Sequence, residues 1–324
     1  MPITTLIGLS NKNMQNELIY GVSQLGDNHR PSAVSIGNYD GVHLGHQHVI
    51  KTLLRESEAL GAAATIVTFE PLAKEFFRPD SVLRLQSLEQ RAEQLFELGV
   101  ERVLCIDFTA EFANLSPMEF AQQVLLDGLG VRFLCVGDDF RFGKDRAGDF
   151  NFLERLGSQH NFDVSAHETF LIDGERVSSG RVRKALANGD FALAKKLIGK
   201  AYSISGVVSL GQQIGRTINF PTANIVLPSK NFAVNGVFVV QALMQDGRSI
   251  NGVANVGNRP TVDGSENRLE VHLFDFEEQI YGEKLLVEFL HKIRDEQKFD
   301  SIELLKKQIS LDAQSARRYF QQHG

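Results

Sequence analysis

Two histidines, His43 and His46, stand three residues apart in a glycine-rich stretch that could bind phosphate. The apolar run at 33–36 predicts a buried strand before this stretch, and apolar residues at helical spacing predict a helix after it. Such a junction offers free backbone N–H groups and the positive end of the helix dipole to an anion. Three glycines permit close backbone approach or a positive φ there, namely Gly37, Gly41 and Gly45. We therefore expect a phosphate site at which both imidazoles point toward one anion.

This predicted site lacks the lysine of the Walker phosphate loop and has two imidazole donors instead. Donors aimed at developing oxyanions suit in-line attack on a nucleoside triphosphate, which needs no covalent nucleophile. An alternative interpretation is that both histidines merely cap the helix or form local hydrogen bonds. A zinc site is a weaker interpretation, because no cysteine lies nearby to complete the set of ligands.

The string from Gly37 to His46 reads Gly-x-x-Asp-Gly-x-His-x-Gly-His and resembles the signature of the nucleotidyltransferase superfamily of the His-x-Gly-His type. The resemblance implies that Asp40 and the glycines bind the nucleotide. It also implies that the two histidines are catalytic and stabilise charge on the α- and β-phosphates. The family usually has Phe where this chain has Tyr39.

Length and composition fit a globular protein with room for two domains. The chain has 324 residues, is 43% hydrophobic and 23% charged, and has a net charge of −6 without a long basic run. Two cysteines, Cys105 and Cys135, lie in apolar runs and suggest buried thiols in a reducing compartment. No signal peptide and no apolar stretch near the roughly 18 residues of a membrane span are visible. We expect a cytoplasmic monomer or weak homo-oligomer that acts on small molecules and binds neither nucleic acid nor membrane.

The first part of the chain alternates strand-like and helical patterns at the spacing of βαβ units. This alternation predicts a Rossmann-like α/β domain, with a parallel sheet covered by helices on both faces and ligands at the carboxyl ends of its strands. The predicted strands are 33–36, 64–69, 102–108, 133–137 and 163–167, and the predicted helices are 44–60, 88–98, 117–129 and 150–160.

The second part has short alternating runs separated by turn residues, which predict an antiparallel β-barrel followed by an amphipathic helix at 301–320. The predicted boundaries are 1–186 for the first domain, 187–200 for a linker with helical character and 201–324 for the second domain. The predicted strands of the barrel are 202–208, 237–243, 250–256, 268–276 and 285–290.

Two further motifs of the first domain resemble the same superfamily. The loop at 137–148 is similar to Gly-x-x-Phe-x-Phe-Gly-x-x-Arg-x-Gly, which implies that Asp139 binds nucleotide and that Phe140 and Phe142 bind flavin. The alternative is a solvated turn with both aromatic rings in the core. One position departs from the family pattern: a Pro-His-Pro-like string is replaced by Pro71, Leu72 and Ala73, so any role of its histidine is absent.

The other motif begins a predicted helix at 178–186, where serine precedes basic residues although a helix start favours acidic ones. A bound triphosphate would resolve this conflict. The string is similar to Ser-Ser-Thr-x-x-Arg with Gly180 in place of threonine, so by resemblance Ser178 and Ser179 bind phosphate and Arg183 neutralises charge in the transition state. An ordinary N-capped surface helix is the alternative.

A second constellation lies at 211–224. Its glycine-rich, basic part could hold phosphates through backbone N–H groups, and Thr222 and Asn224 would present oxygens on one side of an extended segment to Mg²⁺. Gly-Arg-Thr-x-x-Phe-Pro-Thr-Ala-Asn is similar to the signature of riboflavin kinases, although that family normally has Gly where Asn219 stands. The expected nucleotide-binding residues are Gly211, Gly215, Arg216 and Thr217.

Segments 252–261 and 270–276 match the same family, which implies that Glu270 is the general base for the riboflavin 5′-hydroxyl. Without the family match, a solvated strand face would be the preferred interpretation of Glu270. Arg294 and Glu296 resemble the segment that closes over flavin.

The two signatures in this order resemble the bifunctional bacterial flavokinases and FAD synthetases. The resemblance implies a riboflavin kinase barrel and an FMN adenylyltransferase domain, with Mg²⁺, ATP as co-substrate, and riboflavin, FMN and FAD as substrate and products. Composition and spacing alone predict only a two-domain nucleotide enzyme. Two alternatives stay open: a chain that is mainly a riboflavin kinase because of its departures at Leu72, Ala73 and Gly180, and a flavin-holding carrier or sensor.

Overall fold

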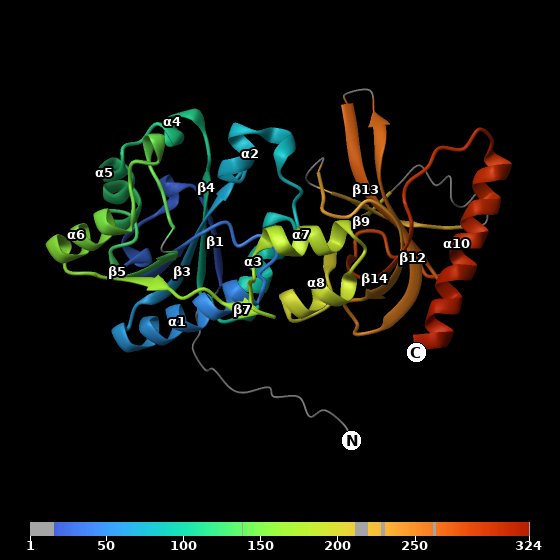
Figure 1. Ribbon diagram of the computed structural model, residues 1–324, viewed down its shortest axis with the longest axis horizontal. Coiled ribbons are helices and arrows are strands. Elements are labelled where there is room, and N and C mark those ends of the chain that lie inside the picture. Colours follow the sequence, from blue (N-terminus) through green and yellow to red (C-terminus); the bar gives the residue numbers. More distant parts are fainter. Residues whose placement is uncertain (1–15, 138, 211–219, 228–230, 262–263, 324) are drawn as a thin grey trace, which may run out of the picture. The chain divides into compact units, whose positions relative to one another are not determined.

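The computed structural model describes residues 16–137, 139–210, 220–227, 231–261 and 264–323 (Figure 1). The chain forms two compact units. The first comprises Met1–Gly37, Ile50–Phe69 and Leu95–Ala166, and the second comprises Asn38–Val49, Glu70–Gln94 and His167–Gly324. The histidine-containing stretch that follows Gly37 therefore belongs to the same unit as the C-terminal part of the chain.

A six-stranded sheet in the order β1-β4-β3-β2-β5-β6 forms the centre of the first unit. β1 pairs in parallel with β4, and β2 pairs in parallel with both β3 and β5. All five predicted strands are present, and β1 was missed because its four residues lie at a sheet edge after a polar stretch. The strands are β1 Glu17–Tyr20, β2 Ser32–Ile36, β3 Ala63–Glu70, β4 Arg102–Asp107, β5 Val131–Gly137 and β6 Asp163–His167.

Helices pack their apolar residues against this sheet, and one hydrophobic core joins the strands to α5, η4 and α6. Asp149 caps α6 by accepting a hydrogen bond from the Phe152 N–H group (2.8 Å), and Asn161 ends it in the left-handed conformation. The predicted helix at 117–129 is divided, because a π-helical segment follows its first turn. The helices along this part of the chain are α1 Leu44–Leu60, α2 Ala73–Phe77, α3 Leu88–Glu97, α4 Ala110–Ala113, α5 Pro117–Phe120, π-helical η4 Ala121–Leu126 and α6 Phe150–His160. Short 3-10 turns are Val22–Gln24, Asp27–His29, Pro79–Ser81 and Lys144–Arg146.

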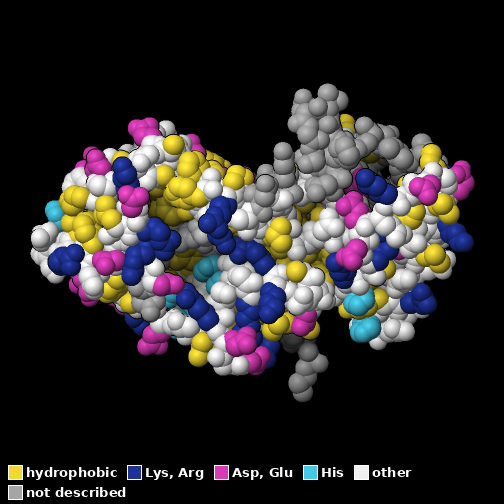
Figure 2. Space-filling view, turned by 45° about the horizontal axis from the view of Figure 1, so that its top comes forward, with side chains coloured by type: hydrophobic (Ala, Val, Ile, Leu, Met, Phe, Trp, Pro, Cys, Tyr) yellow, Lys and Arg dark blue, Asp and Glu magenta, His cyan; other side chains and the backbone are white. Residues whose placement is uncertain are grey.

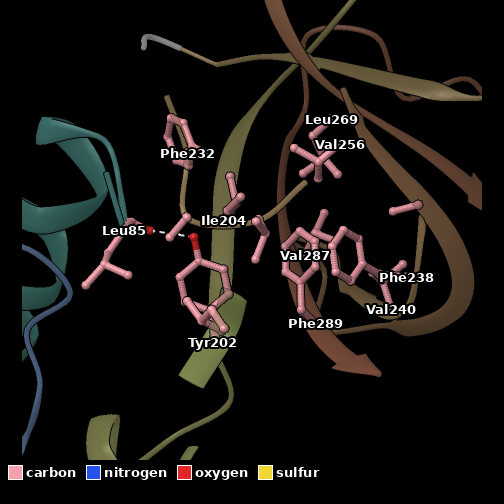
Figure 3. Close-up of a cluster of buried hydrophobic side chains, with 14 of the residues drawn as sticks. Leu85, Tyr202, Ile204, Phe232, Phe238, Val240, Val256, Leu269, Val287 and Phe289 are labelled. Atoms are coloured by element: carbon pink, nitrogen blue, oxygen red, sulfur yellow. Dashed lines mark hydrogen bonds between the residues drawn. The ribbon is translucent and has the colours of Figure 1, made fainter. Parts of the chain in front are cut away.

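The second unit contains a closed antiparallel barrel in the order β10-β13-β12-β11-β14-β9, which confirms the predicted barrel. Its core includes Phe238 and Phe289, whose rings meet edge to face at 5.2 Å (Figure 3). The strands are β9 Ser203–Ser209, β10 Ala223–Val226, β11 Gly236–Leu243, β12 Ser249–Thr261, β13 Gly264–Leu273 and β14 Lys284–Arg294.

The barrel is preceded by a hairpin and two helices and followed by a long helix. These elements are β7 Leu171–Ile172, β8 Glu175–Arg176, α7 Ser179–Ala187, α8 Phe191–Ile198 and α10 Ile302–His323. α10 packs Ala313 and Ala316 against the barrel. The buried Asp312 of this helix accepts two hydrogen bonds from Arg294 of β14, with Nη2–Oδ2 at 2.8 Å. The predicted C-terminal helix is therefore present and is fixed to the barrel by an ion pair.

Among the described residues, no helix combines the length and the apolar character that crossing a membrane requires. On the face shown in Figure 2, basic and acidic side chains are interspersed. This surface fits the modest net charge of the chain.

Truncation of the barrel core should destabilise the protein strongly. The side chain of Phe238 is buried and its ring contacts those of Phe191 and Phe289. We expect Phe238→Ala to lower the free energy of unfolding by about 3–5 kcal/mol, because it removes buried apolar surface and leaves a cavity. Urea unfolding measures the change, with Val226→Ala at an exposed barrel position as the control. Equal losses in both variants would contradict this packing.

Candidate active site

The loop between β2 and α1 is compact because two of its glycines lack room for a side chain. Gly41 has a φ of +89°, and a Cβ atom there would lie 2.6 Å from Leu85 Cδ1. A Cβ atom at Gly45 would lie 3.2 Å from the Val177 carbonyl oxygen. Gly37 has no positive φ, and its N–H group donates to the Val67 carbonyl at 3.0 Å. Of the three predicted glycines, therefore, only Gly41 needs left-handed backbone.

The structure brings His43 and His46 together at the start of α1. Their rings stack with centroids 3.6 Å apart and planes 15° apart. The His46 backbone N–H group donates to His43 Nδ1 (3.3 Å), so a neutral His43 carries its proton on Nε2. His46 Nδ1 is buried and has no hydrogen-bond partner among the described residues. The ring of Tyr39, the departure from the family pattern, lies 4.8 Å from that of His46.

Both imidazoles are neutral at pH 7. Burial, with smaller contributions from the nearby guanidinium groups of Arg176 and Arg183, lowers the pKa of His43 to about 4. Burial also holds the pKa of His46 well below its usual value, with His43 and His167 adding to the effect. Neutral imidazoles present N–H donors to an anion without adding charge. In the part of the chain that the structure describes, no group of three or more His, Cys, Asp or Glu residues could hold a metal ion.

Asp40 is the centre of the contacts that hold this loop. Its carboxylate is 2% exposed, accepts hydrogen bonds from the Leu85 N–H group (3.1 and 3.3 Å) and forms an ion pair with Arg183. Its backbone carbonyl accepts a hydrogen bond from Ser179 Oγ at 2.8 Å. Burial raises the pKa of Asp40, while Arg183 and Arg91 oppose that rise. Asp40 therefore acts as an internal clamp in this structure.

The polar groups at the start of α7 have hydrogen-bond partners within the protein. Ser178 is the N-cap and accepts a hydrogen bond from the Arg181 N–H group at 3.2 Å. Arg181, the basic residue in the first turn, donates to the backbone carbonyls of Ile172 (2.9 Å) and Glu175 (3.1 Å). Arg181 thus has carbonyl partners in the hairpin that precedes α7.

Sequence reasoning missed a buried cluster of charged residues beside this loop. Arg84 pairs with Glu70 and with Glu75 (2.7 Å), and Arg91 donates to the Asn38 carbonyl at 2.7 Å. Both arginine side chains are buried. No motif marks them, and the one available signal is the position of Arg84 between two leucines.

The barrel brings Glu270 beside the predicted metal ligands. In the strand register, Glu270 of β13 lies opposite Asn224 of β10 on one side and Asn255 of β12 on the other. Side chains directly opposite each other on one face of a sheet are close enough to interact. Asn224 donates through Nδ2 to the Thr222 carbonyl (3.1 Å), so its Oδ1 points away from Thr222. Asn255 was part of a matched segment but was not predicted as a site residue.

A cavity of about 560 Å³ has Thr222 in its lining, together with Ala223, Val271, Phe276 and Tyr281. The predicted nucleotide-binding residues Gly211, Gly215, Arg216 and Thr217 lie outside the described residues.

The predicted flavin-binding residues of the barrel have different surroundings. Arg294 is engaged with Asp312 of α10, whereas Glu296 is exposed beside Gly257. His272 of the same strand as Glu270 lies with Nδ1 2.8 Å from the Pro221 carbonyl oxygen.

In the first unit, Phe142 is buried in the core and its ring stacks on that of Phe140 with centroids 5.5 Å apart. Phe140 is half-buried and Asp139 is exposed. One of the two aromatic side chains is therefore a core residue, and the other keeps an accessible face.

Comparison with known proteins accounts for both constellations. The family model "FAD synthetase" matches residues 26–181, and the model "Riboflavin kinase" matches residues 198–320. A bifunctional riboflavin kinase/FMN adenylyltransferase from Pseudomonas fluorescens is 44% identical over 93% of this chain and 97% of that protein. The chain belongs to the family of bifunctional riboflavin kinase/FMN adenylyltransferases. The resemblance seen in the sequence is thereby confirmed.

Another family member, from Escherichia coli K12, is 42% identical over 94% of this chain and 98% of its own length. A solved structure titled as a macrolide-efflux protein from Streptococcus pneumoniae superposes with a TM-score of 0.73. It is 30% identical and covers 93% of this chain and 98% of its own.

Acid should destabilise the histidine loop through His43. Its pKa falls from 6.5 to about 4 on folding, so between these values the unfolded chain binds more protons than the folded one. The stabilising contribution is complete above about pH 6.5 and is lost as the pH falls toward about 4. The free energy of unfolding should therefore fall between pH 7 and pH 4. We expect this fall to be about 2–3 kcal/mol smaller in His43→Gln than in the unsubstituted protein.

Urea unfolding at several pH values tests this expectation, with His160→Gln at the exposed end of α6 as the control. An acid-induced loss of stability that is the same in the protein and in His43→Gln would contradict it.

Proposed function

We propose that the residues around the histidine loop adenylylate FMN and that the barrel phosphorylates riboflavin, each reaction consuming one ATP. The proposed assignment is 1–186 for the adenylyltransferase, 187–200 for the linker and 201–324 for the kinase. It is supported by the two family models and by one structural observation: the stacked imidazoles and the Glu270–Asn224 pair are two separate sets of groups, each suited to one phosphate reaction.

In adenylyl transfer, an FMN phosphate oxygen attacks the α-phosphorus of ATP, and the bond to the bridging oxygen breaks as pyrophosphate leaves. Negative charge grows on the α- and β-phosphate oxygens. Neutral His43 can donate a hydrogen bond from Nε2, and His46 can add a second donor beside it. Arg183 would share its guanidinium between Asp40 and the phosphates, so that its ion pair with Asp40 is kept. Ser178, Ser179, Asp139 and the loop glycines complete the proposed nucleotide contacts. The proposed flavin residues are Phe140, through its accessible face, and Phe142, whose buried ring would support that of Phe140 by stacking on it.

In the kinase reaction, Glu270 takes the proton of the riboflavin 5′-hydroxyl while that oxygen attacks the γ-phosphorus and ADP leaves. The Thr222 hydroxyl and the Asn224 carbonyl oxygen are hard donors that fit Mg²⁺. When bound, this ion would neutralise phosphate charge. Gly211, Gly215, Arg216 and Thr217 are proposed to hold the phosphates. Arg294 and Glu296 are proposed to border the flavin, with Arg294 acting through α10.

The compartment, the partners and the oligomeric state are proposals as well. Two free, buried cysteines, Cys105 and Cys135, fit a reducing compartment and therefore the cytoplasm. We propose small-molecule substrates alone and a monomer or weak homo-oligomer.

Two substitutions should separate the reactions. We expect His46→Ala to slow FAD formation from FMN by about 100-fold or more while FMN formation continues, because it removes a donor to the developing charge. Glu270→Ala should slow FMN formation by a similar factor and leave FAD formation intact when FMN is supplied. Chromatography of the flavins measures both steps in each variant.

His48→Ala is the matched control, because His48 lies on the same helix two residues further on and contacts Phe170. Loss of both reactions in either folded site variant would refute the assignment of one reaction to each site.

Gly180 offers a test of the departure from the family motif. A Cβ atom at this position has only Ser178 Oγ nearby, at 3.8 Å, so a larger side chain fits. We expect Gly180→Thr to raise the rate of FAD formation by roughly tenfold, as one added hydrogen bond to a charged phosphate allows. Gly180→Ala is the control, since it also removes the conformational freedom of glycine but adds no hydroxyl. If the threonine and alanine variants have equal rates, the missing hydroxyl is not what limits this site.

A further inference from the structure

A segment that precedes the barrel by more than a hundred residues is hydrogen-bonded into it. The Arg84 N–H group donates to the Asn231 carbonyl at 2.7 Å. Gln90 donates through Nε2 to the Ser203 carbonyl (2.8 Å) and accepts through Oε1 from the Ser205 N–H group (3.1 Å). Both serines lie in β9. The segment 84–90 is therefore bonded to the barrel at both of its ends.

Leu85 lies in this segment and contacts the barrel and the histidine loop at once. Its side chain is fully buried in the hydrophobic core of the barrel unit, together with Tyr202 and Ile204. Its carbonyl oxygen accepts a hydrogen bond of 2.8 Å from the Tyr202 hydroxyl, which Figure 3 shows pointing toward Leu85. Its N–H group donates to the Asp40 carboxylate (3.1 Å), and its Cδ1 occupies the space that a side chain at Gly41 would need.

Asp40 links the position of Leu85 to that of the two catalytic histidines. The carboxylate lies three residues before His43 and is held between the Leu85 N–H group and Arg183. Tyr202 thus holds Leu85, and Leu85 holds one side of the Asp40 carboxylate. The position of Asp40 in turn determines where the two imidazoles lie. Hydrogen bonds inside a protein are short-ranged and directional, so a shift of Leu85 shifts Asp40 with it.

We propose that Tyr202 is a positioning residue for the transfer of the adenylyl group to FMN. Its hydroxyl orients Leu85, and Leu85 orients Asp40 and the histidine loop. Tyr202 contacts no substrate. It acts on adenylyl transfer, whose catalytic histidines lie outside the barrel. This inference rests on the proposed assignment of adenylyl transfer to the histidine loop.

Tyr202→Phe in the full-length chain tests the inference. The phenylalanine ring keeps the packing against Phe289, where the ring centroids are 5.6 Å apart, and removes only the hydroxyl. We expect kcat for FAD formation to fall about tenfold, as for the loss of one buried hydrogen bond, while KM for ATP and for FMN stays within about twofold. Phosphorylation of riboflavin by the same preparation should be unchanged.

Gln90→Met is the matched control, because it removes two hydrogen bonds between the same segment and β9, one buried and one partly buried, without touching Leu85 or Asp40. A merely structural role of Tyr202 would lower FAD formation equally in both variants, and that result would overturn the inference. So would a Tyr202→Phe variant with unchanged kcat, or one in which phosphorylation of riboflavin falls equally. Failure of the unsubstituted protein to make FAD from FMN would instead refute the proposed function.

Discussion

The buried carboxylate of Asp40 joins three segments that lie far apart in the sequence. It belongs to the loop before α1, accepts hydrogen bonds from the segment 70–94 and pairs with Arg183 of α7. Removing a carboxylate from water costs several kcal/mol unless good partners surround it, so this charge holds its partners as firmly as they hold it. Because the imidazoles follow three and six residues later, their position depends on contacts that no local sequence pattern contains.

The loop also has backbone conformations that ordinary residues avoid. Tyr39 and Val42 have φ values of +50° and +35°, and Gly41 lies between them at +89°. Strained backbone of this kind persists only where the surrounding structure determines it, and it is frequent at functional sites. The burial that depresses the pKa values of both histidines comes from the same compact packing. One arrangement thus accounts for the geometry of the two rings and for their neutral form.

Local patterns predicted the elements well, and long-range contacts account for what they missed. The apolar runs predicted β6 at Asp163–His167 and α6 at Phe150–His160 with the bounds that the structure has. The pairing of Arg183 with Asp40 could not be predicted, because 143 positions separate the two residues. The contacts of Arg181, at the basic start of α7, with the carbonyls of a neighbouring hairpin could not be predicted from the helix pattern either. In the barrel, alternation predicted strands, but the register that sets Asn255 beside Glu270 appears only when the strands pair.

Chromatography of flavins shows whether one chain carries both reactions. Purified protein would be incubated with riboflavin, ATP and Mg²⁺, and the flavins separated over time. We expect riboflavin to be converted to FMN, which rises and then declines as FAD accumulates. FMN that accumulates without FAD would contradict the assignment of the histidine loop. Riboflavin that stays unchanged while bound to the protein would contradict both assignments and favour a flavin carrier.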